Sequence, residues 1–266
     1  MPRLKRSYAE QDQVEAAGPE FLEALARGLR VIEVFNQTNK QLTLSDLARL
    51  VDLPRASVRR TLYTLIELGY AEMNDRLFRL TPRVMTLAGA YLTSNSVSDI
   101  LQPALAAMSE DIQQTCSAAV LEGEEVMMIA FASPKRIIPV SAQIGFRVPA
   151  VASSLGRVML ASLNDKQLEK FLARAQPKKI TKHTVTDKSE LRKTILKVRS
   201  EGYALADQEV ELGFRSIAVP LKRLDGKTIA ALNVGVHSEQ TPLKAMHASY
   251  FPKLRALAER LQRQLI

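Results

Sequence analysis

The sequence predicts an α+β protein in which an N-terminal winged helix-turn-helix is joined by a linker helix to a larger α/β domain. Three amphipathic helical segments separated by tight turns occupy residues 21–69, and two short strands follow over residues 70–80. After residue 115, grouped strands precede and follow amphipathic helices. We expect a flexible arm over residues 1–20, the winged domain over 21–83, the linker helix over 84–96 and the larger domain over 97–266.

The composition is that of a folded protein without a membrane or export segment. The chain has 266 residues, of which 46% are apolar, enough to build a core in each of two domains. No run approaches the ~18 uncharged apolar residues that a membrane span needs, and the basic start leads into polar, acidic sequence. The single cysteine, Cys116, excludes an intramolecular disulfide and fits a reducing compartment. We therefore expect a cytoplasmic protein with no membrane partner.

The formal net charge of +9 suggests a nucleic-acid partner but does not locate the surface that would bind it. Residues 1–83 hold 13 Lys/Arg against 11 Asp/Glu, whereas residues 84–266 hold 24 against 17. An argument for a DNA-binding surface must therefore rest on where individual arginines point.

The first two helices are predicted from apolar spacing and capping residues. Six apolar side chains recur at helical intervals over residues 21–35: Phe21, Leu22, Leu25, Leu29, Ile32 and Phe35. Thr43 is suited to an N-cap, with Asp46 three residues further on. The apolar residues after this cap follow at i, i+3, i+4 and i+7, namely Leu44, Leu47, Ala48 and Val51. The second helix is therefore short and has one apolar face.

A third helix begins after a tight turn at Asp52 and Leu53. Pro54 suits the first helical position, because the N–H that proline lacks would have no partner there. One face of this helix is apolar, and the other is rich in hydrogen-bond donors. Gly69 is suited to a left-handed cap at its end.

The third helix has the features of a recognition helix, because a major groove admits a helix whose first residues reach base edges. The sequence that follows, YAEMNDRLFRL, predicts a two-stranded wing around Asn74 and Asp75. We expect contacts to double-stranded DNA from Arg55, Ala56, Ser57, Arg59, Arg60 and Tyr63 on the helix and from Arg76 and Arg79 on the wing. The alternative is a structural three-helix bundle with a solvated charged face, which the wing disfavours.

The linker predicts a helix over residues 82–93, a polar break at residues 94–96 and a second helix to about residue 113. The two apolar stripes are Val84, Leu87, Ala88 and Tyr91, and then Ile100, Leu101, Leu105, Met108 and Ile112. A linker helix this apolar is expected to pack against a second copy of the chain. We therefore expect a homodimer or a homotetramer.

The remaining sequence predicts a domain of grouped strands with helices outside. A hairpin is expected around residues 122–125 and a further strand over IIPVSAQI, residues 137–144. Helices are expected over residues 154–163, 165–175 and 187–201, the last closed by Gly202, and strands over 203–207, 216–221 and 228–236. The chain should end in a helix pair that is split before Pro252.

Two of these strands each have one bulky face and one small, partly polar face. In the strand over residues 228–236, Ala231, Asn233 and Gly235 share the small face, and in the strand over 216–221 it is formed by Ser216, Ala218 and Pro220. Small residues with a hydroxyl or an amide group are what the lining of a ligand cavity requires. A plain or partner-covered sheet face is the alternative.

The stretch VPAVASSLGRVMLASL adds a helix start to this pattern. Ser153 and Ser154 can cap a helix whose free N–H groups and positive dipole end attract a carboxylate. An ordinary N-cap is the alternative, because most serines at helix starts have that role. Beside the two small strand faces, a cavity for a small carboxylate is expected, with Phe214 and the alanines Ala218 and Ala231 leaving space. Arg147 and Arg215 are candidate charge partners for the carboxylate.

For catalysis the sequence offers little. It contains no GxSxG elbow, no GxGxxG loop and no GxxxxGK[ST] loop, and its three histidines, His183, His237 and His247, are scattered. We expect no catalytic residues, no metal site and no cofactor, and we interpret Cys116 as a small apolar residue entering a strand.

Four segments together resemble the IclR family of bacterial transcriptional regulators: the winged block over residues 21–83, ASSLGRVMLA (152–161), GYALADQEVELGFRSIAVPL (202–221) and AALNVGVH (230–237). The resemblance implies a DNA-binding dimer or tetramer with a GAF-like effector-binding domain that holds a small carboxylate. The segments DQEVELGFRSIAVP and AALNV are most similar to the sequences of the branch that controls aromatic-acid catabolism through the β-ketoadipate pathway.

The resemblance implies that nine residues bind the effector: Ser154, Leu155, Gly156, Asp207, Glu209, Phe214, Ser216, Asn233 and Gly235. Several relatives carry cysteine in place of Ser216 and serines in place of Asn233 and Gly235. The alternative function is an enzyme or carrier for a small acid, tethered to DNA by its helix-turn-helix. A gel shift with and without candidate acids separates the two functions, because turnover leaves a product and regulation does not.

Overall fold

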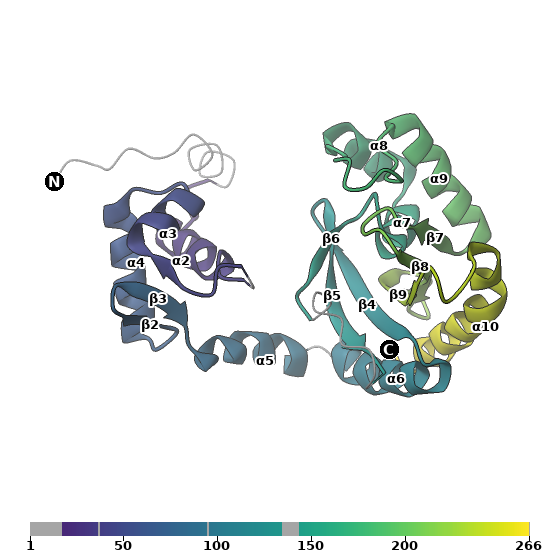
Figure 1. The fold of residues 1–266 in the computed structure, drawn as a ribbon, viewed down its shortest axis with the longest axis horizontal. Coiled ribbons are helices and arrows are strands. Elements are labelled where there is room, and N and C mark those ends of the chain that lie inside the picture. The colour runs from purple at the N-terminus through teal and green to yellow at the C-terminus, as the bar shows by residue number, and fades with distance from the viewer. Residues whose placement is uncertain (1–17, 37, 95, 135–143, 266) are drawn as a thin grey trace. The chain divides into compact units, whose positions relative to one another are not determined.

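The computed structural model describes residues 18–36, 38–94, 96–134 and 144–265. The chain divides into two compact units, Met1–Tyr91 and Leu92–Ile266, and each is described by itself (Figure 1). No helix among the described residues is both long and apolar enough to cross a membrane.

The first unit is the predicted winged helix-turn-helix. Its helices are α2 (Glu23–Glu33), α3 (Leu44–Leu50) and α4 (Arg55–Glu67), and its strands are β1 (Leu42–Thr43), β2 (Ala71–Asn74) and β3 (Leu77–Leu80). The strands form an antiparallel sheet in the order β1-β3-β2. A capping box begins α3, because Thr43 accepts from the Asp46 backbone N–H and the Asp46 carboxylate accepts from Thr43. The hydroxyl and the backbone N–H of Thr43 both donate to the Asp46 carboxylate and hold its pKa below its usual value.

Two local details of this unit differ from the predictions by one residue. Pro54 is the N-cap of α4 instead of its first helical residue, and its carbonyl accepts the N–H groups of Ser57 and Val58. The wing turns at Asp75 and Arg76, which both have positive φ, so β2 extends through Asn74. The predicted left-handed cap is present, since Gly69 has φ +76°.

The apolar stripe of α2 is buried at one end and exposed at the other. Val31 is fully buried in the core of the winged unit, and Ile32 and Phe35 pack against that core. Leu22, Leu25 and Leu29, at the start of the same stripe, are 69%, 61% and 47% exposed. The spacing therefore predicted the helix correctly, but half of its apolar surface has no partner within the described residues.

The linker begins with a short 3₁₀ turn, Pro82–Val84, followed by α5 (Met85–Ser94) and α6 (Ser96–Ile112). Leu87 on α5 is exposed, and the side chain of Tyr91 lies outside the described residues. On α6 the predicted stripe is a core face, with Leu101 and Leu105 fully buried.

The second unit is built on one antiparallel sheet with the strand order β6-β5-β4-β9-β8-β7. The strands are β4 (Thr115–Glu122), β5 (Glu125–Ala132), β6 (Arg147–Pro149), β7 (Ala204–Asp207), β8 (Phe214–Lys222) and β9 (Thr228–His237). The strand predicted over residues 137–144 lies, except for Ile144, outside the described residues.

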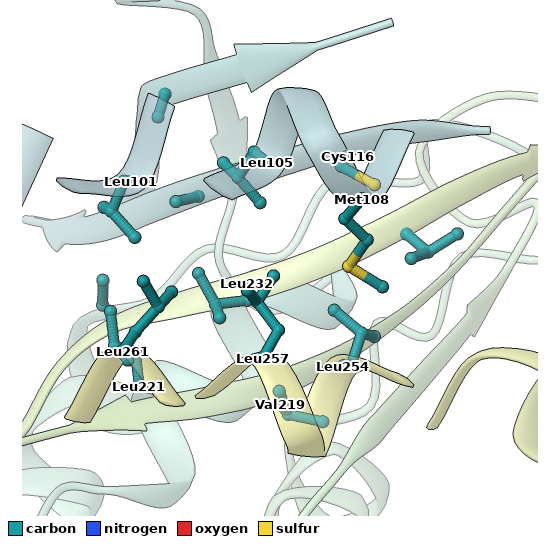
Figure 2. Packing of buried hydrophobic residues seen from close by; sticks show 14 of the residues in the cluster. Leu101, Leu105, Met108, Cys116, Val219, Leu221, Leu232, Leu254, Leu257 and Leu261 are labelled. Carbon is teal, nitrogen blue, oxygen red and sulfur yellow. The ribbon is translucent and has the colours of Figure 1, made fainter. Parts of the chain in front are cut away.

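Helices cover both faces of this sheet. The bulky faces of β8 and β9 pack against α6 and α10 (Leu243–Gln262) in one apolar cluster, which includes Leu221, Leu232 and Leu254 (Figure 2). The opposite face carries α7 (Ser154–Ala161), with α8 (Asp165–Arg174) and α9 (Lys188–Glu201) packed in the same apolar cluster. Every residue of α7 is buried. The predicted division of β8 and β9 into a core face and a small face is therefore confirmed.

The predicted split of the last helix is wrong, because α10 runs through Pro252 without a break. Proline inside a helix costs about 3 kcal/mol, since it removes one backbone hydrogen bond and crowds the preceding turn. Five buried residues on both sides of Pro252 (Met246, Tyr250, Leu254, Leu257 and Leu261) form one continuous stripe against the sheet. Burial of each such side chain contributes about 1.5 to 3 kcal/mol, which outweighs the cost of the proline.

Candidate DNA-binding surface and effector cavity

The exposed face of α4 carries the predicted arginines. Val58, Leu62 and Leu65 point into the core of the winged unit, so the opposite face of the helix is free. Arg55, Ala56, Arg59, Arg60 and Tyr63 are exposed and line one shallow hollow together with Leu44 and Thr64. No acidic side chain among the described residues pairs with Arg55, Arg59 or Arg60, which leaves their guanidinium groups available to phosphates or base edges.

The expectation that Ser57 is available for DNA contact does not hold, because this side chain is buried. Ser57 is 7% exposed and lies on the side of α4 that faces α2, in a small hollow with Ala24 and Gly28. Counting residues along a helix gives angles but does not say which neighbouring helix covers each side. Ser57 therefore lies at the α2–α4 contact.

The two wing arginines differ in their surroundings. Arg79 on β3 forms an ion pair with Glu72 on the neighbouring strand. Arg76 lies in the turn with φ +70° and is exposed. Arg76 is therefore the wing residue better placed for a phosphate, and it remains a proposed contact, as does Arg79.

Replacing Arg60 with alanine is expected to weaken binding to the protein's own promoter DNA without unfolding the winged unit, because Arg60 is exposed and Val58, Leu62 and Leu65 are untouched. Loss of a base contact costs about 1 to 3 kcal/mol and relaxes specificity, whereas loss of a phosphate contact weakens binding to all sequences alike. Gel shifts at matched salt concentration measure the effect. Arg255→Ala removes the same charge from α10 and should leave the affinity unchanged. Unchanged affinity in Arg59→Ala/Arg60→Ala protein would exclude α4 as the recognition helix.

The second unit contains a cavity of about 490 Å³ on the small-residue face of the sheet. It lies between the start of α7, the ends of β4, β8 and β9, and the loop that joins β7 to β8. Of the effector-binding residues expected from the family, seven line it: Ser154, Leu155, Glu209, Phe214, Ser216, Asn233 and Gly235. Strands β8 and β9 bring Ser216 and Gly235 side by side as a register pair.

Two buried polar pairs lie in the cavity wall. The hydroxyl groups of Ser154 and Ser216 are 2.7 Å apart and join α7 to β8. The hydroxyl of Ser117 donates to Oδ1 of Asn233 over 2.7 Å and joins β4 to β9. No acceptor for Nδ2 of Asn233 exists among the described residues, although this side chain is only 6% exposed. The wall therefore presents an amide donor that no described residue engages.

Two of the expected residues do not line the cavity. Asp207 forms an ion pair with Arg215 at the β7–β8 contact, which engages both side chains with each other. Gly156 lies in the first turn of α7, and its N–H donates to Oγ of Ser153. A Cβ atom on Gly156 would lie 2.1 Å from the carbonyl oxygen of Ala150, so this glycine allows close packing of the backbone.

Other predictions for the cavity need correction. Arg147 pairs with Glu122 and does not line the cavity, and Arg215 does not line it either. Ala218 and Ala231 are on the predicted face of the sheet but pack against the apolar cluster of α7. Their small size serves the close approach of that helix, because larger side chains would lift it from the sheet. Part of the small face of β8 and β9 therefore lines the cavity, and part of it packs against α7.

Several cavity residues were missed in the sequence. Ser117 and Thr115 form a small polar face on β4, which the alternation rule used for β8 and β9 could have identified. Phe131 and Phe146 reach the cavity from β5 and from the residue just before β6. No local pattern marks these two rings, because they meet the cavity only through the pairing of distant strands.

Cys116 takes no part in the cavity. Its side chain is fully buried on the opposite face of β4, in the apolar cluster of α6 and α10. Burial raises the pKa of the Cys116 thiol to about 12, so the thiol stays neutral and unreactive at physiological pH. The interpretation of Cys116 as a small apolar residue is confirmed.

The two units together define a class of protein. An exposed arginine-bearing helix with a wing is the surface by which helix-turn-helix proteins dock in the major groove. A cavity with aromatic walls and a few placed polar groups is typical of small-molecule binding. A chain that carries both is a ligand-responsive DNA-binding regulator.

Comparison with known proteins agrees with this class. Residues 24–75 match the IclR helix-turn-helix domain, and residues 89–263 match the bacterial transcriptional regulator IclR C-terminal domain. The chain belongs to the IclR family of transcriptional regulators.

Three relatives are informative. The Pca regulon regulatory protein of Pseudomonas putida is 38% identical over 99% of this chain and 91% of its own length. The p-hydroxybenzoate hydroxylase transcriptional activator of Acinetobacter baylyi is 31% identical over 91% of this chain and 92% of its own. An IclR homologue from Microbacterium hydrocarbonoxydans, solved in complex with 4-hydroxybenzoate, is 28% identical with a TM-score of 0.76, covering 91% of this chain and 98% of that one.

Proposed function

We propose that this chain regulates genes of aromatic-acid catabolism, in the β-ketoadipate pathway, and that a small aromatic monocarboxylate in the cavity controls its activity on DNA. The observation that carries the proposal is a set of buried donors in an aromatic cavity that have no acceptor among the described residues. The similarity to the Pca regulon regulatory protein of Pseudomonas and to the p-hydroxybenzoate hydroxylase activator of Acinetobacter supports the proposed class of regulated genes. The 4-hydroxybenzoate complex of the Microbacterium homologue supports the chemistry of the effector.

The start of α7 is the proposed seat of the carboxylate. The backbone N–H groups of Ser154 and Leu155 have no acceptor among the described residues, and both residues are buried. They lie at the positive end of a helix dipole, which favours a negative charge. The hydroxyl pair of Ser154 and Ser216 lies beside them, and the free amide of Asn233 adds a further donor in the same wall.

The other walls suit a ring. Phe131, Phe146 and Phe214 line the cavity together with Met128. Aromatic side chains pack against a ring in offset or edge-to-face arrangements, and a thioether adapts to its edge. The volume of about 490 Å³ accommodates a substituted benzene ring.

The charge of the lining favours one carboxylate over two. Among the described residues that line the cavity there is no lysine and no arginine. A single carboxylate can be satisfied by the helix N-terminus and the neighbouring hydroxyl groups. A second one would find no lysine or arginine in the lining, only His237, and would add to the negative charge of Glu211. A hydroxybenzoate therefore fits the lining better than a dicarboxylate of similar size.

Calorimetry with 4-hydroxybenzoate, protocatechuate and β-ketoadipate tests the proposal. We expect the two aromatic acids to bind more tightly than β-ketoadipate. The same acids should alter the gel shift of promoter DNA and should be recovered unchanged, because a regulator does not consume its effector. Preferential binding of β-ketoadipate would contradict the monocarboxylate proposal. A product formed from any of the acids would favour the enzyme alternative.

We also propose that the protein works as a homodimer or homotetramer on DNA. Leu22, Leu25 and Leu29 on α2 and Leu87 on α5 are large apolar residues that remain exposed in a single chain, and such surfaces are typical of subunit contacts. Sedimentation velocity at micromolar concentration should give a dimer or a larger species, and Leu25→Glu/Leu29→Glu should shift it toward the monomer. A wild-type monomer under these conditions would contradict the proposal.

A further inference from the structure

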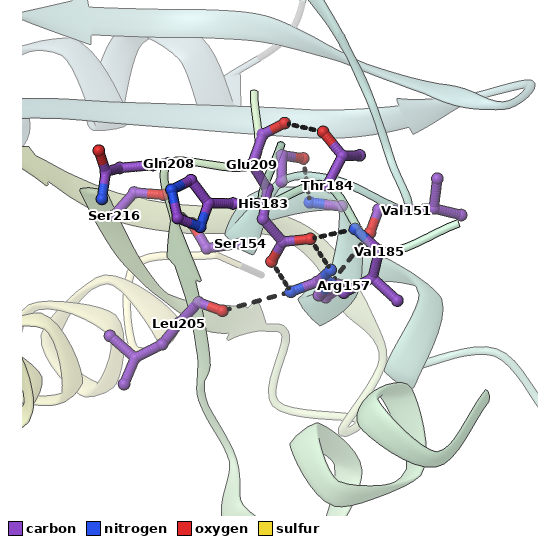
Figure 3. Close-up of polar contacts among 12 residues, drawn as sticks. Val151, Ser154, Arg157, His183, Thr184, Val185, Leu205, Gln208, Glu209 and Ser216 are labelled. Atoms are coloured by element: carbon purple, nitrogen blue, oxygen red, sulfur yellow. Dashed lines mark hydrogen bonds and ion pairs between the residues drawn. The ribbon is translucent and has the colours of Figure 1, made fainter. Parts of the chain in front are cut away.

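Arg157, one turn into α7, forms a buried ion pair with Glu209 in the loop between β7 and β8. Its two terminal nitrogens each donate to one carboxylate oxygen over 2.6 Å, and the side chains are 3% and 9% exposed (Figure 3). No other ion pair among the described residues has both side chains this deeply buried. The third guanidinium nitrogen, Nε, donates to the carbonyl of Val151 over 2.9 Å.

Glu209 lines the cavity, and protein donors engage both of its carboxylate oxygens. In addition to the two bonds from Arg157, its Oε2 accepts the N–H of Val185 over 3.1 Å, and its carbonyl accepts the hydroxyl of Thr184 over 2.7 Å. Its charge would repel a bound carboxylate if Arg157 did not neutralise it. We therefore interpret the family match that places Glu209 in the effector site as a role in holding the cavity wall.

The loop that carries Glu209 has a strained backbone at the cavity. Gln208 has φ +58°, a left-handed conformation that costs a residue other than glycine roughly 1 to 3 kcal/mol and persists only where the surroundings hold it. Its carbonyl accepts the hydroxyl of Thr181 over 2.6 Å, and its N–H donates to the carbonyl of Phe214 over 2.8 Å. Residues 208–211 all line the cavity. The ion pair is thus one of the contacts that hold this loop against the cavity.

The same guanidinium holds the opposite wall. Val151, whose carbonyl it binds, lies two residues before Ser153, the N-cap of α7. Arg157 itself belongs to the helix that begins with Ser154 and Leu155. One side chain therefore connects the proposed carboxylate seat with the loop on the other side of the cavity.

We propose that Arg157 and Glu209 are positioning residues for effector recognition: their ion pair sets the distance between the start of α7 and the loop over residues 207–214. The proposal rests on the proposed function of the cavity. Stability alone does not account for the pair, because replacing a buried ion pair with apolar residues of similar volume is often neutral or stabilising. Removal of one partner is different, because it leaves an uncompensated buried charge.

The test uses the full-length protein with both partners replaced, Arg157→Met/Glu209→Leu. The matched control is Arg192→Met/Glu169→Leu, which removes an exposed pair between α8 and α9 of the same 2.6 Å length. The probe is 4-hydroxybenzoate in calorimetry, together with amide hydrogen exchange of the ligand-free protein. We expect the double variant to stay folded and to bind the acid at least ~10-fold more weakly, which corresponds to the loss of one positioned hydrogen bond. Its amide hydrogens should exchange faster over residues 207–214, while those of α9 stay protected. The control should match wild type.

Arg157→Lys provides a graded variant that keeps the buried charge. Lysine cannot form the bidentate contact together with the bond to Val151, so affinity and loop protection should fall between wild type and the double variant. If the double variant fails to fold, this variant decides the question. Wild-type affinity together with wild-type protection of residues 207–214 in the folded variants would overturn the proposal. Absence of binding by the wild type would refute the effector proposal instead, and the exchange measurement would still test the positioning role.

Discussion

Replacing Gly235 with leucine is expected to abolish the effector response while leaving DNA binding intact. Gly235 lies in the cavity wall beneath the ring of Phe214, and a Cβ atom there would lie 2.5 Å from Cζ and 2.8 Å from Cε2 of that ring. Even the first carbon of a new side chain therefore displaces the ring. A leucine and a displaced ring together occupy the space in which the effector ring is proposed to lie. The winged unit is a separate compact unit and should keep its affinity for promoter DNA.

Calorimetry and gel shifts measure the two halves of this prediction. Gly235→Ala should weaken effector binding less than Gly235→Leu, because only one methyl group presses on the ring. Phe214→Ala/Gly235→Leu should regain part of the lost affinity, since the leucine then has the space that the ring vacated. Equal effector affinity in wild type and Gly235→Leu would show that the effector binds elsewhere.

Gly156→Ala is expected to destabilise the second unit severely, although alanine is the better helix former. The added Cβ would lie 2.1 Å from the carbonyl oxygen and 2.2 Å from Cα of Ala150, both of them backbone atoms that cannot swing aside. The gain in helix propensity is at most ~1 kcal/mol. Forced overpacking of a dense core costs ~1 to 3 kcal/mol and more where backbone must move, and α7 is buried along its whole length. The clash therefore outweighs the propensity, and we expect a net loss of at least ~2 kcal/mol.

Hydrogen exchange of the β8 and β9 amides measures the stability of the second unit separately from that of the winged unit. Gly28→Ala in α2 is the matched control, because nothing lies within 4 Å of its Cβ position. That substitution should stabilise the winged unit by up to ~1 kcal/mol. Wild-type stability in Gly156→Ala protein would mean that α7 can move away from Ala150 without cost.

Much of the fold could be predicted because the signals are local. The capping box of Thr43 and Asp46, the left-handed Gly69 and the wing depend on residues a few positions apart. The same holds for the alternation that divides β8 and β9 into a bulky and a small face, which correctly indicated Ser216, Asn233 and Gly235 as cavity residues. Each of these patterns is set by backbone geometry over one turn of helix or two residues of strand.

The tertiary structure alone decided which groups meet. Arg157 and Glu209 are 52 residues apart, and Ser117 and Asn233 are 116 residues apart. Asp207 and Glu209 appear equivalent in the sequence, yet one pairs with Arg215 beside it and the other with Arg157 on a distant helix. The continuity of α10 through Pro252 likewise depends on the sheet beneath it. The sequence by itself determined the elements and their faces, because short-range sterics and periodicity act within each segment. The partners of buried charges and the walls of the cavity depended on the packing of distant segments, where the cost of burying an unpaired polar group selects one arrangement.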